Sequence, residues 1–281
     1  MAYMQKKWVS HDKRFIVVDK YHSVRAMPKN ESARERRRPK KQITSEQQEK
    51  INLRHRTERF QRLIMDNFKE GDWWIAFTLA EKVSVAEFKK AYGKMIRSLR
   101  KFYEEHGMDI KYIAVQENLE GRGRLHGHIL LPSIPGVDFG KMKRALSNAW
   151  ALGNTYFKPY EAKTMDARKV AAYMTKEETL INTLNEKMQV KRAGGNTKAL
   201  DAELKAKRSR ICTSLNLIRT KEVKTMVPRG SFRKEIKAPK GYHVVWPLSY
   251  NGNTDDNFDY QHAVFERDDD YPQNPQGRSN L

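Results

Sequence analysis

Two histidines separated by one residue, His126 and His128 in the segment RLHGHILL, are the strongest candidates for chemistry in this sequence. The apolar residues that follow them predict a strand, and residues i and i+2 of a strand point to the same side. Two imidazoles side by side make half of a metal site. Glu117, near the end of a second expected strand, supplies an oxygen ligand if the two strands pair as a hairpin. Gln116, which faces the other way on that strand, is the alternative third ligand.

A second reactive group lies in the segment KVAAYMTKE, where Tyr173 and Lys176 are three positions apart on an expected helix. That spacing puts a phenol and an ammonium group on one helical face. A phenol is a weak nucleophile at neutral pH because its pKa is about 10. A neighbouring cation and a metal-bound phosphate stabilise the phenolate and the charge that develops at phosphorus. The pair therefore fits phosphoryl transfer to tyrosine.

Other chemistries fail on the residue types present. A binuclear hydrolase of the His-x-His-x-Asp-His type needs Asp and His where this chain has Leu130 and Leu131, and a histidine-triad hydrolase needs His at 130. Gly136, Gly140 and Lys141 are spaced one residue too closely for a P-loop. We therefore expect no nucleotide cofactor and no ATP-driven motor.

The elements that must position these residues follow one another in a recognisable order. The expected strands cover residues 73–80, 110–117, 125–131 and 155–160, and two expected helices begin at the capping residues Ser84 and Asp138. The order strand, helix, strand, strand, helix, strand is the ferredoxin-like or RRM-like α+β arrangement (βαββαβ). Its first and third strands lie at the centre of one antiparallel sheet, so the two histidines are expected on a central strand, with the tyrosine on a helix that follows the sheet.

The flanking segments differ in composition from this core. The predicted organisation is a flexible basic arm at 1–45, a lead-in helix at 46–72, the main domain at 73–218 with a helical insertion at 180–208, a C-terminal extension at 219–252 and an acidic tail at 253–281. The arm has no sustained apolar period. The tail is rich in Asp, and we expect it to be loosely ordered and to compete with DNA for basic surface.

The charge balance points to a polyanionic partner. Lys and Arg number 55 against 34 Asp and Glu, a net charge of +21, while 38% of the residues are hydrophobic, as in a folded protein. Nucleic acid is the leading partner for so basic a chain. The candidate DNA-binding residues lie on the helix that begins at Ser84, in the hairpin loop and in the arm: Lys89, Lys90, Lys94, Arg97, Lys101, Arg122, Arg124, Arg36, Arg37 and Arg38.

Cysteine content and hydropathy bear on the compartment. The single Cys212 excludes an internal disulfide and a multi-cysteine zinc module, which favours a reducing compartment. No run approaches the ~18 apolar residues of a membrane span, and the first residues lack the apolar core of a signal peptide. We therefore expect a cytoplasmic protein with no membrane partner.

Three segments resemble the motifs of the HUH endonucleases, and among them those of the rolling-circle replication initiator (Rep) proteins of bacterial plasmids, phages and related mobile elements. IAFTLA, which contains Thr78, resembles the first motif; LHGHILL resembles the second, metal-binding motif; and VAAYMTKE resembles the third, with its nucleophilic tyrosine. The histidines precede the tyrosine, as in replication initiators. ICTSLNL at 211–217 and the lead-in at 50–72 are similar to flanking segments of phage and plasmid members. The resemblance covers about 73–217.

The resemblance implies a metal-dependent endonuclease and DNA strand transferase that nicks and rejoins single-stranded or hairpin origin DNA in a bacterial cytoplasm. His126, His128 and Glu117 would hold Mg2+ or Mn2+, and Tyr173 would form a 5′-phosphotyrosine link and release a 3′-OH. Lys176 would stabilise charge near the phosphate or the tyrosine. A host helicase and polymerase would be partners, because the chain has no helicase motif.

This sequence departs from the family pattern in two places. Gly127 stands where the family has a bulky apolar residue, which we expect to alter local packing and to let a helix approach the sheet closely. The helix also carries one tyrosine where some initiators have two, so termination would need a second protomer or water. Alternative functions are an HUH transposase or mobilisation nuclease with the same site, and a non-catalytic RRM-like nucleic-acid-binding protein that stacks bases on sheet aromatics.

Overall fold

The structure is a computed structural model that describes residues 2–23, 45–120, 123–232, 235–253 and 258–268. It divides into two compact units. One unit is built from both ends of the chain, Met1–Lys40 and Arg219–Leu281, and the other from Lys41–Ile218. The second unit contains every motif singled out above except the basic arm.

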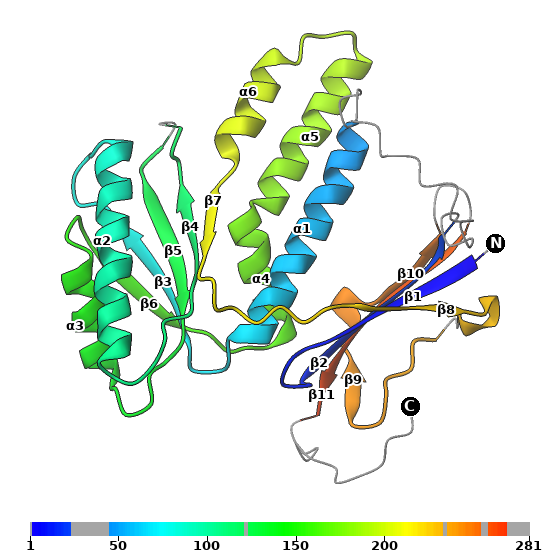
Figure 1. Ribbon diagram of the computed structural model, residues 1–281. Helices are drawn as coiled ribbons and strands as arrows, with labels where there is room; N and C mark the ends of the chain where they lie inside the picture. The colour runs from blue at the N-terminus through cyan, green and yellow to red at the C-terminus, as the bar shows by residue number, and fades with distance from the viewer. Residues whose placement is uncertain (1, 24–44, 121–122, 233–234, 254–257, 269–281) are drawn as a thin grey trace, which may run out of the picture. The chain divides into compact units, whose positions relative to one another are not determined.

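The unit Lys41–Ile218 is built around an antiparallel sheet of strand order β6-β3-β5-β4-β7 (Figure 1). Its elements, in chain order, are α1 (Glu46–Asn67), β3 (Trp73–Thr78), α2 (Val85–Glu104), β4 (Ile113–Glu117), β5 (His126–Leu131), α3 (Phe139–Ala149), β6 (Thr155–Pro159), α4 (Thr164–Thr175), α5 (Glu177–Arg192), α6 (Lys198–Lys207) and β7 (Arg210–Thr213). The run from β3 to β6 is the expected βαββαβ order, with β3 and β5 in the centre. The α+β, ferredoxin-like prediction is confirmed.

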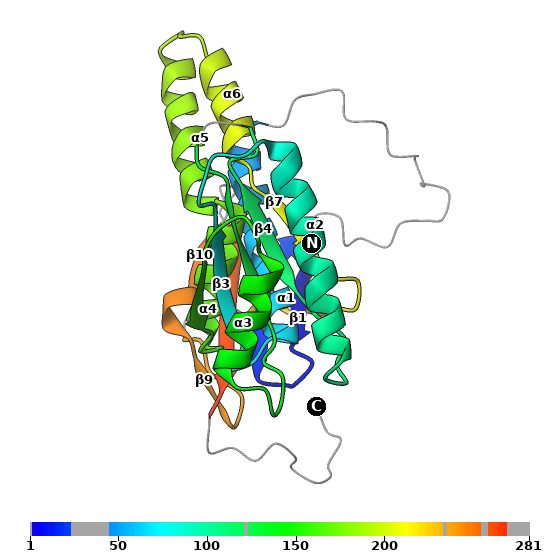
Figure 2. The same cartoon turned by 90° about the vertical axis from the view of Figure 1, so that its left-hand side faces the viewer.

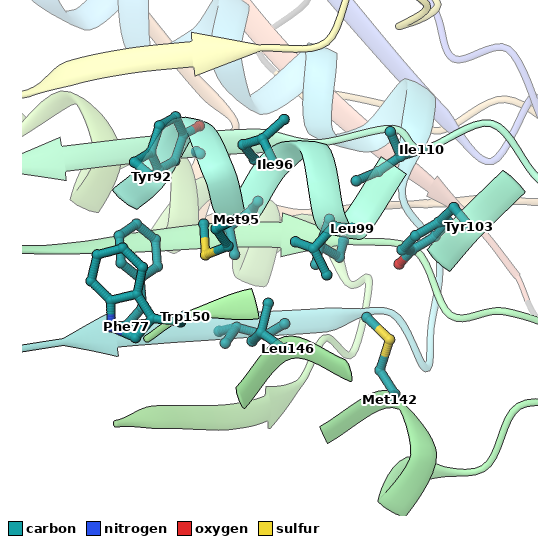
Figure 3. Packing of buried hydrophobic residues seen from close by; sticks show 14 of the residues in the cluster. Phe77, Tyr92, Met95, Ile96, Leu99, Tyr103, Ile110, Met142, Leu146 and Trp150 are labelled. Carbon is teal, nitrogen blue, oxygen red and sulfur yellow. The ribbon is translucent and has the colours of Figure 1, made fainter. Parts of the chain in front are cut away.

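Helices α2 and α3 cover one face of this sheet and lie in front of the strands in Figure 2. A capping box between Ser84 and Glu87 starts α2, and the Asp138 side chain caps α3. Residues at three-to-four spacing on α2 are fully buried against the sheet (Figure 3), among them Met95, Leu99 and Tyr103. This packing is the main hydrophobic core, and it leaves the other sheet face for polar residues.

Helices α1 and α4 pack together beyond that other face, and the α5–α6 hairpin extends from them (Figure 1). Thr57 of α1 and Thr175 of α4 share a buried hydrogen bond of 2.8 Å. The expected insertion at 180–208 is thus a helical hairpin, whose Leu180 and Leu204 pack on Leu53 of α1. The lead-in helix therefore fixes the position of α4 within the unit.

Gly127 lies under an aromatic ring of the neighbouring strand. It pairs with Phe77 across β5 and β3, and a Cβ at position 127 would lie 2.3 Å from the Phe77 ring and 2.6 Å from the carbonyl oxygen of Val115. We expected a helix to use this space, but the Phe77 side chain fills it. Phe77 is fully buried, so the glycine and the ring act as one packing unit.

The terminal unit is a second antiparallel sheet, of order β10-β11-β2-β1-β8 with β9 paired to β11. Its strands are β1 (Ala2–Val9), β2 (Phe15–Ser23), β8 (Val223–Val227), β9 (Tyr242–Val244), β10 (Tyr250–Asn253) and β11 (Asp259–Arg267). Ile16, Ile236 and Phe265 form its small core. A buried ion pair joins His262 Nδ1 to Asp19 Oδ1 at 2.6 Å.

This unit replaces two expected features. The sequence favoured a flexible arm at 1–45 and a loosely ordered tail at 253–281, but residues 2–23 form β1 and β2, and residues 259–267 form β11. The short apolar runs of β2 and β11 become buried only by pairing with each other, and Arg14 pairs with Glu266 at 3.2 Å. Residues 24–44, which include Arg36, Arg37 and Arg38, lie outside the described residues, as do 254–257 and 269–281.

Replacing Gly127 with valine is expected to destabilise the protein by about 1–3 kcal/mol, because the new side chain overlaps the Phe77 ring. Gly93→Ala is the matched control, since a Cβ there meets only the Arg97 guanidinium at 3.6 Å, and alanine in a helix is favoured by up to about 1 kcal/mol. Urea unfolding followed by circular dichroism should show opposite shifts of the midpoint. Equal midpoints for Gly127→Val and wild type would contradict this account of the packing.

Candidate active site

Strand register brings the three expected metal ligands together. Glu117 pairs directly with His126 across β4 and β5, and His128 lies two residues further along β5 on the same face. Glu117 Oε2 lies 3.5 Å from His126 Nε2, and Glu117 Oε1 lies 3.7 Å from His128 Nε2. All three ligand atoms are within 4.8 Å of one another. Gln116 points to the opposite face, where it pairs with Gly127, so the geometry favours Glu117 over Gln116 as the third group.

The ring of His126 is oriented by the backbone. Its Nδ1 lies 2.9 Å from the carbonyl oxygen of Arg124, so Nδ1 carries the proton and Nε2 keeps a lone pair toward Glu117. The Asn118 amide donates to the same carbonyl oxygen at 2.9 Å, from a residue in the left-handed region at φ 61°. The Arg124 guanidinium donates to the carbonyl oxygen of Leu79. The described part of the β4–β5 loop therefore holds His126 in a ligand-ready tautomer.

His128 is held by an aromatic stack and kept neutral by burial. Its ring stacks on Trp74 of β3 with centroids 5.1 Å apart and planes 10° apart. Burial lowers the pKa of His128 to about 4, although the Glu117 carboxylate acts in the opposite direction. The imidazole is therefore unprotonated at neutral pH, which is the form that binds a metal.

Tyr173 reaches the same group of side chains from α4. Ala167, Ala171 and Met174 are fully buried and fix the helix, while Tyr173 is 39% exposed. The Tyr173 hydroxyl lies 2.8 Å from His128 Nε2. Burial raises the pKa of Tyr173 well above its ordinary value, and the Glu117 carboxylate adds to the rise. The phenol is thus protonated in the metal-free geometry and sits beside the three ligands.

Lys176 is positioned by an unusual backbone conformation rather than by a helical face. It lies between α4 and α5 in the left-handed region, with φ 55° and ψ 37°. A non-glycine residue pays roughly 1–3 kcal/mol for such a conformation, which is common at functional sites. The side chain forms an ion pair with Glu117, and its Nζ lies 4.3 Å from the centroid of the Tyr173 ring. The bend therefore brings the ammonium group to both the carboxylate and the phenol.

The group Glu117, His126 and His128 has the chemistry and spacing of a divalent metal site. Two ligands about 2.0–2.2 Å from one ion, at angles of 90–110°, lie about 3–3.5 Å from each other. The two oxygen to nitrogen distances here, 3.5 and 3.7 Å, are close to that range. Glu117 Oε1 is buried and accepts no hydrogen bond from the described residues. These residues therefore fit a cation, which would compete with Lys176 for the carboxylate.

The structure does not bring all of the expected DNA-binding residues to this site. The basic residues of α2 are exposed, but α2 covers the sheet face opposite to the histidines: Lys89, Lys90, Lys94, Arg97 and Lys101. Arg124 lies close to the site, whereas Arg122 falls outside the described residues, as the arm arginines do. A role of the α2 residues in DNA binding stays a prediction.

Two aromatic residues on the histidine face were not identified from the sequence as site residues. Trp74 stacks on His128, and Tyr156 pairs with Ala76, which in turn pairs with His128. Tyr156 is 60% exposed, so its ring is available for stacking with a base. Alternation along β3 and β6 carries the signal that would have found them, because it places both residues on the side opposite to the buried Ile75 and Phe77.

Residues 72–178 match the model of a family described as Replication-associated protein ORF2. The match spans less than half of the 281 residues, but it contains Glu117, both histidines, Tyr173 and Lys176. It agrees with the expectation of a replication initiator. No curated protein and no solved structure matches the chain. Among the described helices, none has the length and apolar character needed to cross a membrane.

Replacing Glu117 with glutamine is expected to weaken Mn2+ binding by about tenfold or more, because the anionic oxygen becomes a neutral amide. Gln116→Leu is the matched control, since Gln116 is buried on the other face, and its affinity should stay within about twofold of wild type. Isothermal titration with Mn2+ measures both. An equal loss in the two variants, or no binding by wild type, would rule out this ligand set.

Proposed function

We propose that this protein is a rolling-circle DNA replication initiator that nicks and rejoins single-stranded or hairpin origin DNA through a 5′-phosphotyrosine intermediate. The observation that carries the proposal is the position of the Tyr173 hydroxyl, 2.8 Å from the Nε2 of His128, one of the three candidate metal ligands. A nucleophile and a cation site this close can act on one phosphate group. The match to a replication-associated family supports the replication role.

Glu117, His126 and His128 would hold Mg2+ or Mn2+. When bound, the ion supplies Lewis-acid polarisation of a non-bridging phosphate oxygen. Imidazole ligands favour Mn2+ in purified protein, whereas Mg2+ is a common choice for phosphate chemistry. The Trp74 stack and the Arg124 carbonyl oxygen hold the two imidazoles in place, so little reorganisation is needed when the phosphate arrives.

Tyr173 would attack phosphorus. Its hydroxyl oxygen forms the new bond to phosphorus, and the bond to the 3′-oxygen breaks, so that the DNA ends in a free 3′-OH and the 5′-phosphate stays on the protein. The high pKa of Tyr173 opposes ionisation. The Lys176 ammonium group, 4.3 Å from the ring centroid, stabilises the phenolate and the charge on the phosphate.

The chemistry conserves the phosphodiester energy in the tyrosine link, so the same site can rejoin strands. The free 3′-OH would prime synthesis by a host polymerase, and a host helicase would separate the strands. Lysines and arginines bind the DNA backbone in a salt-dependent manner. Exposed Tyr156, on the histidine face, offers a stacking surface for single-stranded DNA near the cut. The basic face of α2, on the far side of the sheet, would contact flanking DNA only.

Tyr173→Phe is expected to abolish covalent adduct formation, because phenylalanine has no oxygen to attack phosphorus. Tyr156→Phe is the matched control, since it loses a hydroxyl on the same sheet face but keeps the ring, and it should form the adduct at the wild-type level. The measurement is a denaturing gel of protein mixed with end-labelled single-stranded oligonucleotides tiled across the DNA element that encodes it, with Mn2+ or EDTA.

A Mn2+-dependent, SDS-resistant adduct that is lost in Tyr173→Phe is the expected outcome, and its cleavage site separates a replication origin from the ends or transfer site that a transposase or mobilisation nuclease would cut. Tight binding with no adduct on any oligonucleotide would leave the RRM-like binding protein as the better description.

Lys176→Met is expected to slow cleavage by about 10²-fold, because the site loses the cation that faces both Tyr173 and Glu117. Its Mn2+ affinity should stay equal or increase, since the ammonium group no longer competes for Glu117. Lys191→Met, on the exposed surface of α5, is the matched control and should cleave at the wild-type rate. Single-turnover cleavage and Mn2+ titration test this together; loss of Mn2+ binding in Lys176→Met would point to a structural role instead.

A further inference from the structure

A cavity of about 220 Å3 opens beside Tyr173, between α4 and the sheet. Asp166, Lys169 and Tyr173 contribute one wall, from a single face of α4. Trp74 and Lys158 contribute another wall, and they pair in register on β3 and β6. The cavity thus lies on the face of the sheet that carries His126 and His128, next to the candidate metal site but separate from its ligands.

The lining of this cavity suits one base of a nucleic acid. Its volume lies below the range of roughly 300–1,000 Å3 that is typical of pockets for drug-sized ligands, so it has room for one planar ring system rather than a larger molecule. Trp74 and Tyr173 supply aromatic surface, with ring centroids 6.1 Å apart. Lys158 and Lys169 are exposed and carry the charge that a phosphate chain needs.

Asp166 supplies a polar group with a defined preference. Its Oδ2 is buried and has no hydrogen-bond partner among the described residues. An ionised carboxylate only accepts hydrogen bonds. Cytosine, adenine and guanine carry exocyclic amino groups that can donate to it, whereas thymine has none. A buried acceptor without a donor disfavours an occupant that cannot donate.

We propose that this cavity binds the base next to the scissile phosphate and that Asp166 selects a base with an exocyclic amino group. The inference rests on the proposed function, because the wall residue Tyr173 is the proposed nucleophile and places the occupant beside the cut. Asp166 is then a specificity-determining residue of the nickase, and thymine is excluded at one position of the origin.

Asp166 also lies in the first turn of α4, where a negative charge favours the helix. Loss of that effect would weaken all DNA substrates equally, since it does not depend on the base. Discrimination between bases therefore separates recognition from helix stability.

The test is a double-mutant cycle between Asp166→Asn and deletion of the amino group from the DNA. Each base within three positions of the mapped nick is replaced in turn, including purine in place of adenine and 2-pyrimidinone in place of cytosine. Wild-type protein should cleave the substrate that lacks the amino group about tenfold more slowly at one position adjoining the nick. Asp166→Asn should show a difference of less than about threefold at that position, because an amide also donates. Binding of the same labelled oligonucleotides is followed by fluorescence anisotropy.

Glu161→Gln is the matched control, because Glu161 also lines the cavity but is exposed, and it should keep the wild-type discrimination. Discrimination that persists in Asp166→Asn, or its absence from wild type at every position, overturns the inference while leaving the nickase intact. If no adduct forms but binding shows the same Asp166-dependent preference, the nickase fails and the base cavity stands. If neither appears, both are overturned.

Discussion

The Glu117 carboxylate is the group around which the candidate site is arranged. It is almost fully buried at the end of β4, and a buried negative charge is costly unless cations or hydrogen-bond donors surround it. Two imidazoles, the Lys176 ammonium group and the Tyr173 hydroxyl converge on it from β5, from the bend between α4 and α5, and from α4. One electrostatic requirement thus explains why the sheet, the lead-in helix α1 and the strained residue at 176 must all be in place together.

Much of this site was accessible from the sequence because it depends on short-range periodicity. The i, i+2 rule put His126 and His128 on one face, and the hairpin between two predicted strands brought Glu117 opposite to them. The choice between Glu117 and Gln116 needed the pairing register, which a one-residue slip would have reversed. The αL conformation of Lys176 also lay beyond prediction, because a lysine in the middle of a helical pattern carries no signal for a bend.

The terminal unit was missed for a different reason. Its strands β2 and β11 have short apolar runs beside many charged residues, and local composition favoured an arm and a tail. The stabilising contacts join residues that are far apart along the chain, such as Val17 and Val264. Propensity and patterning act over a few residues, so pairing at this distance is invisible to them until both partners are known.

The pairing of the two chain ends also sets an order of events during synthesis. A ribosome adds about 5–20 residues per second, so roughly 12–50 s separate the emergence of β2 from that of β11. During this interval the β1–β2 hairpin is at most marginally stable and has open edges. The unit Lys41–Ile218 is complete earlier and can fold first. A message or chain cut short after Ile218 would therefore yield that folded unit joined to an unpaired hairpin, which proteases and other strand edges can attack.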